Sequence, residues 1–192
     1  MVWYHEFVEA TKPLVPKKNQ QTRPRWSLTA VGVLKLNVDG AFLHKNTDGG
    51  IGGILRNSHG HAIAAFAYHL TDVISLKQVE LEAIRTGLQW MHKLGYHDYE
   101  VQTDCQLAVQ DISATDFLQM EYGNILADIH VALNKMRNVK ITFAARTTNW
   151  AAHRLDSFAF EQSNQLEWLD SIPIMLREVL RVCNLPFPSY SC

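Results

Sequence analysis

Apolar and polar residues alternate along one segment in the first half of the chain, and two short, largely apolar segments follow it. Between Leu34 and Leu43, leucine and valine alternate with lysine, asparagine and aspartate, which predicts a β-strand that carries Asp39 near its end. Gly49–Arg56 and Ala62–Leu70 predict two further strands, and the short polar loops between the segments are typical of hairpins. The first half is therefore expected to form an antiparallel meander.

The period becomes helical after residue 75. Apolar residues recur every three or four positions along Leu76–Leu94, which predicts a helix that stops at Gly95. The elements expected next are a strand over Tyr99–Thr103, helices over Gln106–Ile112 and Glu121–Met136, a strand over Val139–Ala145, and a helix from Asn149 to about Glu161, capped by Asn149 or Thr148. This order predicts an α/β fold: a five-stranded mixed sheet, with three antiparallel strands and then two further strands, flanked by helices.

The periodic signal divides the chain into three zones. Residues 1–33 form a basic lead-in that contains three prolines, residues 34–162 form the predicted domain, and residues 163–192 form a C-terminal extension. In this extension, Trp168 and the apolar stretch 174–182 predict a helix that docks on the domain.

Composition narrows the class of protein without identifying a function. Of the 192 residues, 47% are hydrophobic and 19% are charged, which suits a packed core, and the net charge of -1 argues against tight, unaided binding to nucleic acid. The sequence lacks an apolar run of the ~20 residues that a membrane helix needs, a signal-peptide pattern, and cysteine spacings typical of disulfides or zinc. We therefore expect an intracellular protein of the nucleus or cytoplasm, neither secreted nor in a membrane.

Three acidic residues are expected to converge. Asp39 and Asp104 each follow or end a predicted strand, and neighbouring parallel strands would bring them to one edge of the sheet, where the first long helix would add Glu80. Clustered carboxylates repel one another unless a cation lies between them, and such oxygen ligands suit Mg²⁺. Phosphoryl transfer is the reaction class that uses such sites, although a single acid at a strand end is most often a turn residue.

Five motifs in order carry a family resemblance. They are NVDGAF at residues 37–42, GGIGGILRNSHG at 49–60, VELEAIRTGL at 79–88, VQTDC at 101–105 and RTTNWAAHRL at 146–155. This series resembles the ribonuclease H type-1 family, most closely its plant reverse-transcriptase-like branch, which is related to retroelements. The resemblance covers about residues 26–162, including a lead-in formed by Trp26, Gly32 and Lys35.

The resemblance implies a ribonuclease H-like fold and an endonuclease that hydrolyses the RNA strand of RNA–DNA hybrids. It further implies two Mg²⁺ ions, or Mn²⁺, held by four acids. Three of these map to Asp39, Glu80 and Asp104, as catalytic residues and metal ligands. Glu82 competes with Glu80 in the same motif, but it points to the other side of the helix and is expected to be solvated.

The fourth acidic position departs from the family. Four residues after Asn149 the chain has His153, which could ligate Mn²⁺ or Zn²⁺ better than Mg²⁺, move protons near the attacking water, or be a surface histidine. Asp156 lies ~4.5 Å further along the helix axis, a large displacement for direct Mg²⁺ geometry, so we give it little weight.

Substrate binding is expected to be weak and sensitive to salt. Residues 105–134 contain four acids and no lysine or arginine, and these acids repel a polyanion. Candidate contacts to the hybrid are Asn37, Gly40, Gln78 and Asn149. The alternative is a domesticated retroelement domain with little or no activity that acts as a nucleic-acid-binding or protein-interaction module.

Overall fold

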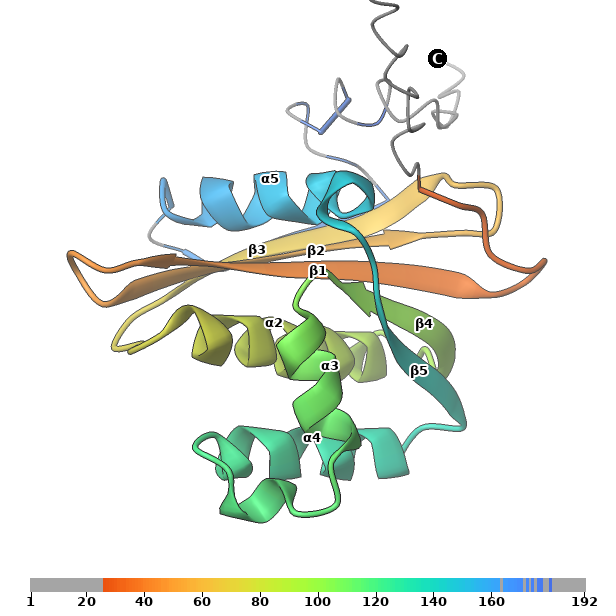
Figure 1. Ribbon diagram of the computed structural model, residues 1–192. Coiled ribbons are helices and arrows are strands. Elements are labelled where there is room, and N and C mark those ends of the chain that lie inside the picture. The colour runs from red at the N-terminus through yellow and green to blue at the C-terminus, as the bar shows by residue number, and fades with distance from the viewer. Residues whose placement is uncertain are drawn as a thin grey trace, which may run out of the picture.

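A computed structural model describes residues 26–162, 164–170, 172, 174, 176, 177 and 180 (Figure 1). In this part of the chain, six strands form one mixed sheet in the order β5-β4-β1-β2-β3-β6. The strands are β1 (Leu34–Leu43), β2 (Asp48–Arg56), β3 (Ala62–Leu70), β4 (Asp98–Thr103), β5 (Asn138–Phe143) and β6 (Leu166–Leu169). The helices are α2 (Leu76–Lys93), α3 (Gln106–Ser113), α4 (Gly123–Asn134) and α5 (Trp150–Ala159), with short 3-10 helices η1 (Phe117–Gln119) and η2 (Arg146–Thr148).

The pairing of the strands confirms the predicted fold class. Strands β1, β2 and β3 form the antiparallel meander, while β4 runs parallel to both β1 and β5. In the β1–β4 register Asn37 lies opposite Gln102, so the chain positions two residues later, at Asp39 and Asp104, reach the same edge of the sheet.

Helices cover the two faces of the sheet unequally. Helices α2, α3 and α4 lie on one face and α5 lies on the other (Figure 1). The apolar residues of β1, such as Leu36 and Val38, belong to the larger core beneath α2, and a smaller core packs β2 and β3 against α5. Because side chains alternate along a strand, Lys35, Asn37 and Asp39 point to the α5 side.

Two glycines of the GGIGG motif allow α5 to lie against β2. A Cβ atom at Gly52 would stand 2.5 Å from the backbone nitrogen of Asp156 and 2.7 Å from the carbonyl oxygen of Ala152, and one at Gly50 would overlap the Asp156 carbonyl. These contacts are too short for any other residue. The glycines therefore bring the middle of α5 within reach of β1.

The C-terminal extension differs from the predicted docked helix at Trp168. This residue lies in β6, a sixth strand that pairs antiparallel with β3. Four residues are too few to show a clear period of two, whereas the free edge of β3 offers backbone groups that pair with them. Further along, residues 174, 176, 177 and 180 are helical, and Leu176 and Leu180 are buried in the smaller core.

The flanking zones are only partly described. Trp26, near the end of the lead-in, is buried in the smaller core together with Leu176 and Leu180. Residues 1–25 of the predicted basic lead-in and 181–192 of the extension lie outside the described residues. No helix in the described part has both the length and the apolar composition needed to cross a membrane.

Candidate metal centre

Five titratable side chains gather where β1 and β4 end. Asp39 comes from β1, Asp104 directly follows β4, Glu80 comes from α2, and His153 and Asp156 come from α5. Their potential ligand atoms form two groups that share Asp39: one with Glu80 and Asp104, the other with His153 and Asp156. In each group these atoms lie within 4.8 Å of one another. The structure thus brings together the four predicted site residues and adds Asp156.

The first group consists only of carboxylate oxygens. Glu80 is 6% exposed, and its Oε2 atom has no hydrogen-bond partner within the described part of the chain. The close approach of α2 to β1 depends on Gly40, where a Cβ would lie 2.9 Å from the backbone carbonyl of Val79. A buried oxygen without a partner is costly, and a divalent cation among three carboxylates would satisfy it. The donor set of this group therefore fits Mg²⁺.

Burial and mutual repulsion raise the pKa values of these acids. Loss of solvation and the charges of Asp39 and Asp104 raise the pKa of Glu80 to about 9. Loss of solvation, with the charge of Asp39, raises the pKa of Asp104 to about 6. Burial also raises the pKa of Asp39, against the opposing effect of its contact with His153. Without a cation, the cluster therefore retains protons that a bound metal would displace.

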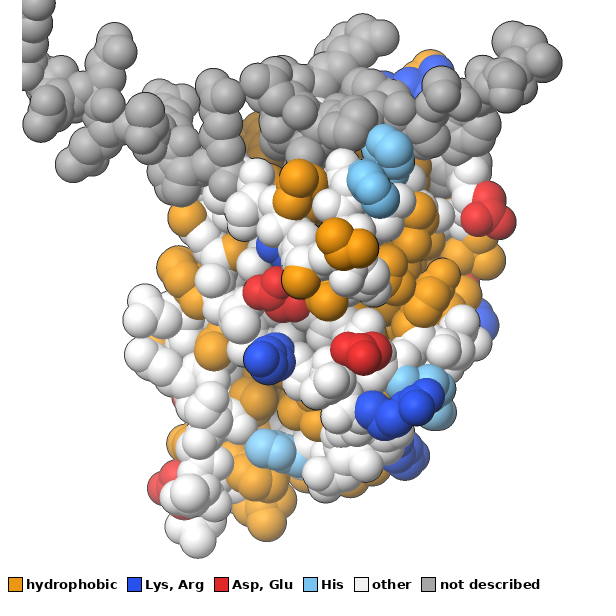
Figure 2. All heavy atoms as spheres, turned by 90° about the vertical axis from the view of Figure 1, so that its right-hand side faces the viewer, with side chains coloured by type: hydrophobic (Ala, Val, Ile, Leu, Met, Phe, Trp, Pro, Cys, Tyr) orange, Lys and Arg blue, Asp and Glu red, His pale blue; other side chains and the backbone are white. Residues whose placement is uncertain are grey.

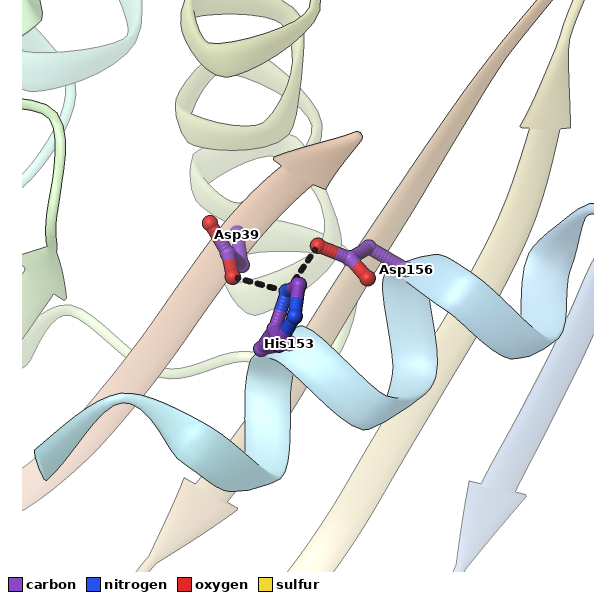
Figure 3. A group of neighbouring side chains, drawn as sticks. All are labelled: Asp39, His153 and Asp156. Atoms are coloured by element: carbon purple, nitrogen blue, oxygen red, sulfur yellow. Dashed lines mark hydrogen bonds and ion pairs between the residues drawn. The ribbon is translucent and has the colours of Figure 1, made fainter. Parts of the chain in front are cut away.

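The second group contains a nitrogen donor. His153 Nδ1 lies 3.2 Å from Asp39 Oδ2 and 3.2 Å from Asp156 Oδ2, so the ring bridges two carboxylates (Figure 3). The contact with Asp39 raises the pKa of His153. On the other side, Arg146 Nη2 lies 3.3 Å from His153 Nε2, and because guanidinium only donates, this contact fits a neutral ring with its proton on Nδ1.

Asp156 belongs to the site, although its distance along the helix from His153 counted against it. Its side chain is fully buried, its pKa is raised by burial, and its Oδ1 accepts a hydrogen bond of 2.9 Å from Ser157 Oγ. Residues three apart share one face of a helix, and both side chains reach Asp39. That spacing was the signal that could have identified it.

The four candidate substrate contacts lie away from the surface or serve the fold. Asn37 and Asn149 are fully buried, and Gly40 is buried beside α2. Asn149 does not cap α5 with its side chain; its Nδ2 donates 2.9 Å to the carbonyl oxygen of Val38. Gln78 is half-buried and its Oε1 accepts a hydrogen bond from the Ile74 nitrogen. Direct contact with a hybrid does not fit the burial of Asn37, Asn149 and Gly40.

Two neighbours of the site, Glu82 and Cys105, differ in their surroundings. Glu82 is not solvated as expected, because its carboxylate is largely buried and lies 2.6 Å from Arg85 Nη2. It is absent from both ligand groups, which leaves Glu80 as the acid of the motif that reaches Asp39. Cys105 is a half-buried free cysteine, and burial raises the pKa of its thiol, which disfavours a nucleophilic thiolate.

Comparisons with known proteins agree with this architecture. Similar solved structures include a ribonuclease H1 from the archaeon Halobacterium salinarum (TM-score 0.59, 21% identity, 68% of this chain and 98% of that one). A second is the N-terminal ribonuclease H domain of a Mycobacterium tuberculosis protein (TM-score 0.59, 17% identity, covering 67% of this chain and 93% of that one). A third is LC11 ribonuclease H1, isolated from compost and solved with an RNA/DNA hybrid (TM-score 0.58, 17% identity, covering 67% of this chain and 96% of that one).

The sequence comparison identifies a family. No curated protein matches the chain. The family described as reverse transcriptase-like matches residues 37–159, which include all five residues of the two ligand groups. Because this match spans more than half of the sequence, the chain belongs to the reverse transcriptase-like family, and its fold is that of the ribonucleases H.

Proposed function

We propose that this protein is a Mg²⁺-dependent endonuclease that hydrolyses the RNA strand of RNA–DNA hybrids. The observation that carries the proposal is the buried carboxylate of Glu80, which lies in one ligand group with Asp39 and Asp104 and whose Oε2 atom has no hydrogen-bond partner among the described residues. The fold supports the substrate class, since a structural neighbour was solved with an RNA/DNA hybrid. Asp39, Glu80 and Asp104 are the proposed metal ligands, and His153 is the proposed fourth catalytic residue.

Each side chain has a defined task in this proposal. The three carboxylates hold the cation, which when bound stabilises the charge that develops on the phosphate oxygens. His153 is 22% exposed at its side chain and lies at the edge of the site, so its ring can exchange a proton with a water or a leaving oxygen. Asp156 holds that ring against Asp39. Mn²⁺ is an alternative ion, and two ions are expected with substrate.

Weak, salt-sensitive binding of the hybrid is part of the proposal. Figure 2 shows a face on which lysine and arginine side chains lie among acidic, polar and hydrophobic ones. Two of the four acids in residues 105–134 are paired with cations of α2: Asp111 with Lys77 at 2.5 Å, and Asp128 with Arg85 at 2.9 Å. These pairs neutralise the repulsion in part, but they also occupy two cations that could contact phosphates.

A binding or interaction module without cleavage is the second candidate. The observation in its favour is His153, whose ring already has contacts on both nitrogens without any metal. In that case the acids would be remnants of a catalytic site, and the protein would only bind a nucleic acid or another protein.

Cleavage of a labelled RNA strand paired with DNA tests the proposal. At low salt, we expect cleavage in Mg²⁺ and a loss of at least ~1,000-fold in Asp104→Asn, because one of three charged ligands is removed. Asp98→Asn, at the exposed start of the same strand, is the matched control and should cleave normally. A higher rate in Mn²⁺ would indicate nitrogen ligation by His153. Equal cleavage by Asp104→Asn, or none by folded wild-type protein in either metal, would overturn it.

A further inference from the structure

A buried hydrogen-bond chain connects the lead-in to the candidate metal centre. Trp26 Nε1 donates 3.0 Å to Asn37 Oδ1, Asn37 Nδ2 donates 3.2 Å to Asn149 Oδ1, and Asn149 Nδ2 donates 2.9 Å to the carbonyl oxygen of Val38. Trp26 is 6% exposed, and both asparagines are fully buried. Because all three side chains are buried, each link constrains the next.

The direction of the chain is set at both of its ends. An indole N–H can only donate and a carbonyl oxygen can only accept, whereas each asparagine amide can turn either end toward its neighbour. The Trp26 indole therefore fixes the amide of Asn37, with Nδ2 toward Asn149, and the Val38 carbonyl oxygen fixes the amide of Asn149 in the matching orientation. Asn37 Nδ2 also lies 3.3 Å from Gln102 Oε1 on β4, which gives it a second acceptor in the same orientation.

The far end of the chain touches the backbone of the metal centre. The Val38 carbonyl belongs to the peptide group that leads into Asp39, the residue that both ligand groups share. The backbone oxygen of Asn149 accepts a hydrogen bond of 3.1 Å from the backbone nitrogen of His153. Asn149 thus joins the strand that carries Asp39 to the helix that carries His153.

Two buried cations hold the indole in place. Lys35 Nζ and Arg56 Cζ each lie 4.9 Å from the centre of the Trp26 ring, and these residues are 2% and 1% exposed. Lys35 Nζ also donates 3.0 Å to the Ser27 carbonyl oxygen. Cations over an aromatic ring are attracted most strongly where water is excluded. The ring therefore has one position and the N–H one direction.

We infer that Trp26 is a positioning residue of the metal centre, acting through Asn37 and Asn149 on the distance between Asp39 and His153. The inference rests on the proposed function for its effect on cleavage, but the arrangement of the side chains can be tested without it. Loss of a partner that orients metal ligands typically lowers metal affinity or activity ~10–100-fold.

Trp26→Phe tests the inference, because it keeps an aromatic ring beside the two cations and removes the N–H donor. Trp168→Phe is the matched control, since Trp168 packs against the same smaller core. In metal-free protein, we expect the NMR signal of the His153 Cε1–H group to move in Trp26→Phe and to stay in place in Trp168→Phe. With hybrid, kcat should fall ~10-fold in Trp26→Phe, with KM unchanged.

A second variant separates positioning from general damage to the fold. Asn149→Ala breaks the chain at its last link and should move the same His153 signal, and combining it with Trp26→Phe should add little further loss of Mg²⁺ affinity. An unchanged His153 signal in folded Trp26→Phe, or fully additive losses, would overturn the inference. If the signal moves while the wild type neither binds Mg²⁺ nor cleaves, the proposed function fails and the positioning role stands.

Discussion

The two sides of Asp39 show opposite ways of accommodating buried charge. Toward α2, Asp39 meets Glu80 and Asp104, and an oxygen of Glu80 is left without a partner in the described structure. Toward α5, it meets His153, whose ring is shared with Asp156, which in turn accepts from Ser157. The oxygen side leaves one buried oxygen without a partner among the described residues, whereas the side chains on the histidine side contact one another. One aspartate therefore joins a group whose donors fit a cation to a group whose members already partner one another.

This contrast predicts an order of metal binding. Hard divalent cations prefer all-oxygen sites, so the first ion should bind with Glu80 and Asp104. An ion on the other side would have to displace the Nδ1 proton of His153 and turn Nε2 from an acceptor into a donor that faces Arg146. A second ion is therefore expected to bind more weakly, with help from substrate phosphates.

The largest effect is expected from a change that breaks both sides. Asp39→Asn removes the shared charge, so we expect cleavage to fall at least ~1,000-fold and Mg²⁺ binding to disappear in calorimetry, with the fold retained. Asp48→Asn is the matched control, because Asp48 also lies beside a histidine, His69, at 3.7 Å on the neighbouring strand. Residual Mg²⁺ binding of wild-type strength in Asp39→Asn would show that the ion lies elsewhere.

A smaller effect should follow from making the two sides alike. His153→Asp replaces the nitrogen donor by oxygen and adds a charge between Asp39 and Asp156, so the site should need a cation on this side as well. We expect the Mg²⁺ concentration for half-maximal cleavage to fall ~10-fold and any advantage of Mn²⁺ to vanish. His69→Asp, beside Asp48, is the control. An unchanged requirement for Mg²⁺ would mean that His153 does not lie at the site of the second ion.

The fold could be predicted where the period of the sequence was long and clean. Strand β1 begins and ends where the alternation does, β3 has the bounds predicted for it, and α2 ends one residue before the predicted end. Strand β6 could not be found in this way, because its four residues are defined by pairing with β3 rather than by their own pattern.

Within the site, predictability depended on the chemistry of the residue. Carboxylates at strand ends are informative because parallel neighbours bring them together, and Asp39 and Asp104 do meet. Asparagine side chains are not informative in this way. The sequence around Asn37 would be the same whether its amide faced a substrate or, as here, a buried tryptophan. The spacing of three residues places Asp156 on the same helix face as His153, but its approach to Asp39 also depends on the path of α5 over the glycines of β2, which no local pattern reveals.

The smallest effect concerns stability without metal. Burial raises the pKa of Glu80 from an ordinary value of 4.5 to about 9, so the folded state holds this proton more tightly than the unfolded state. The stability contributed is complete below pH 4.5 and is lost as pH rises toward 9. Glu80→Gln should therefore be more stable than the wild type at pH 8 in chelator, and no more stable at pH 4.

Urea denaturation of both proteins at the two pH values measures this difference, with Glu161→Gln at an exposed position as the control. Adding Mg²⁺ should reverse the order at pH 8, because only the wild type gains stability by binding the ion. Equal stabilisation of both proteins by Mg²⁺ would mean that the ion does not use the unpartnered oxygen of Glu80. The oxygen side of Asp39 would then tolerate its buried charge without a cation, and the contrast with the histidine side would not arise from metal binding.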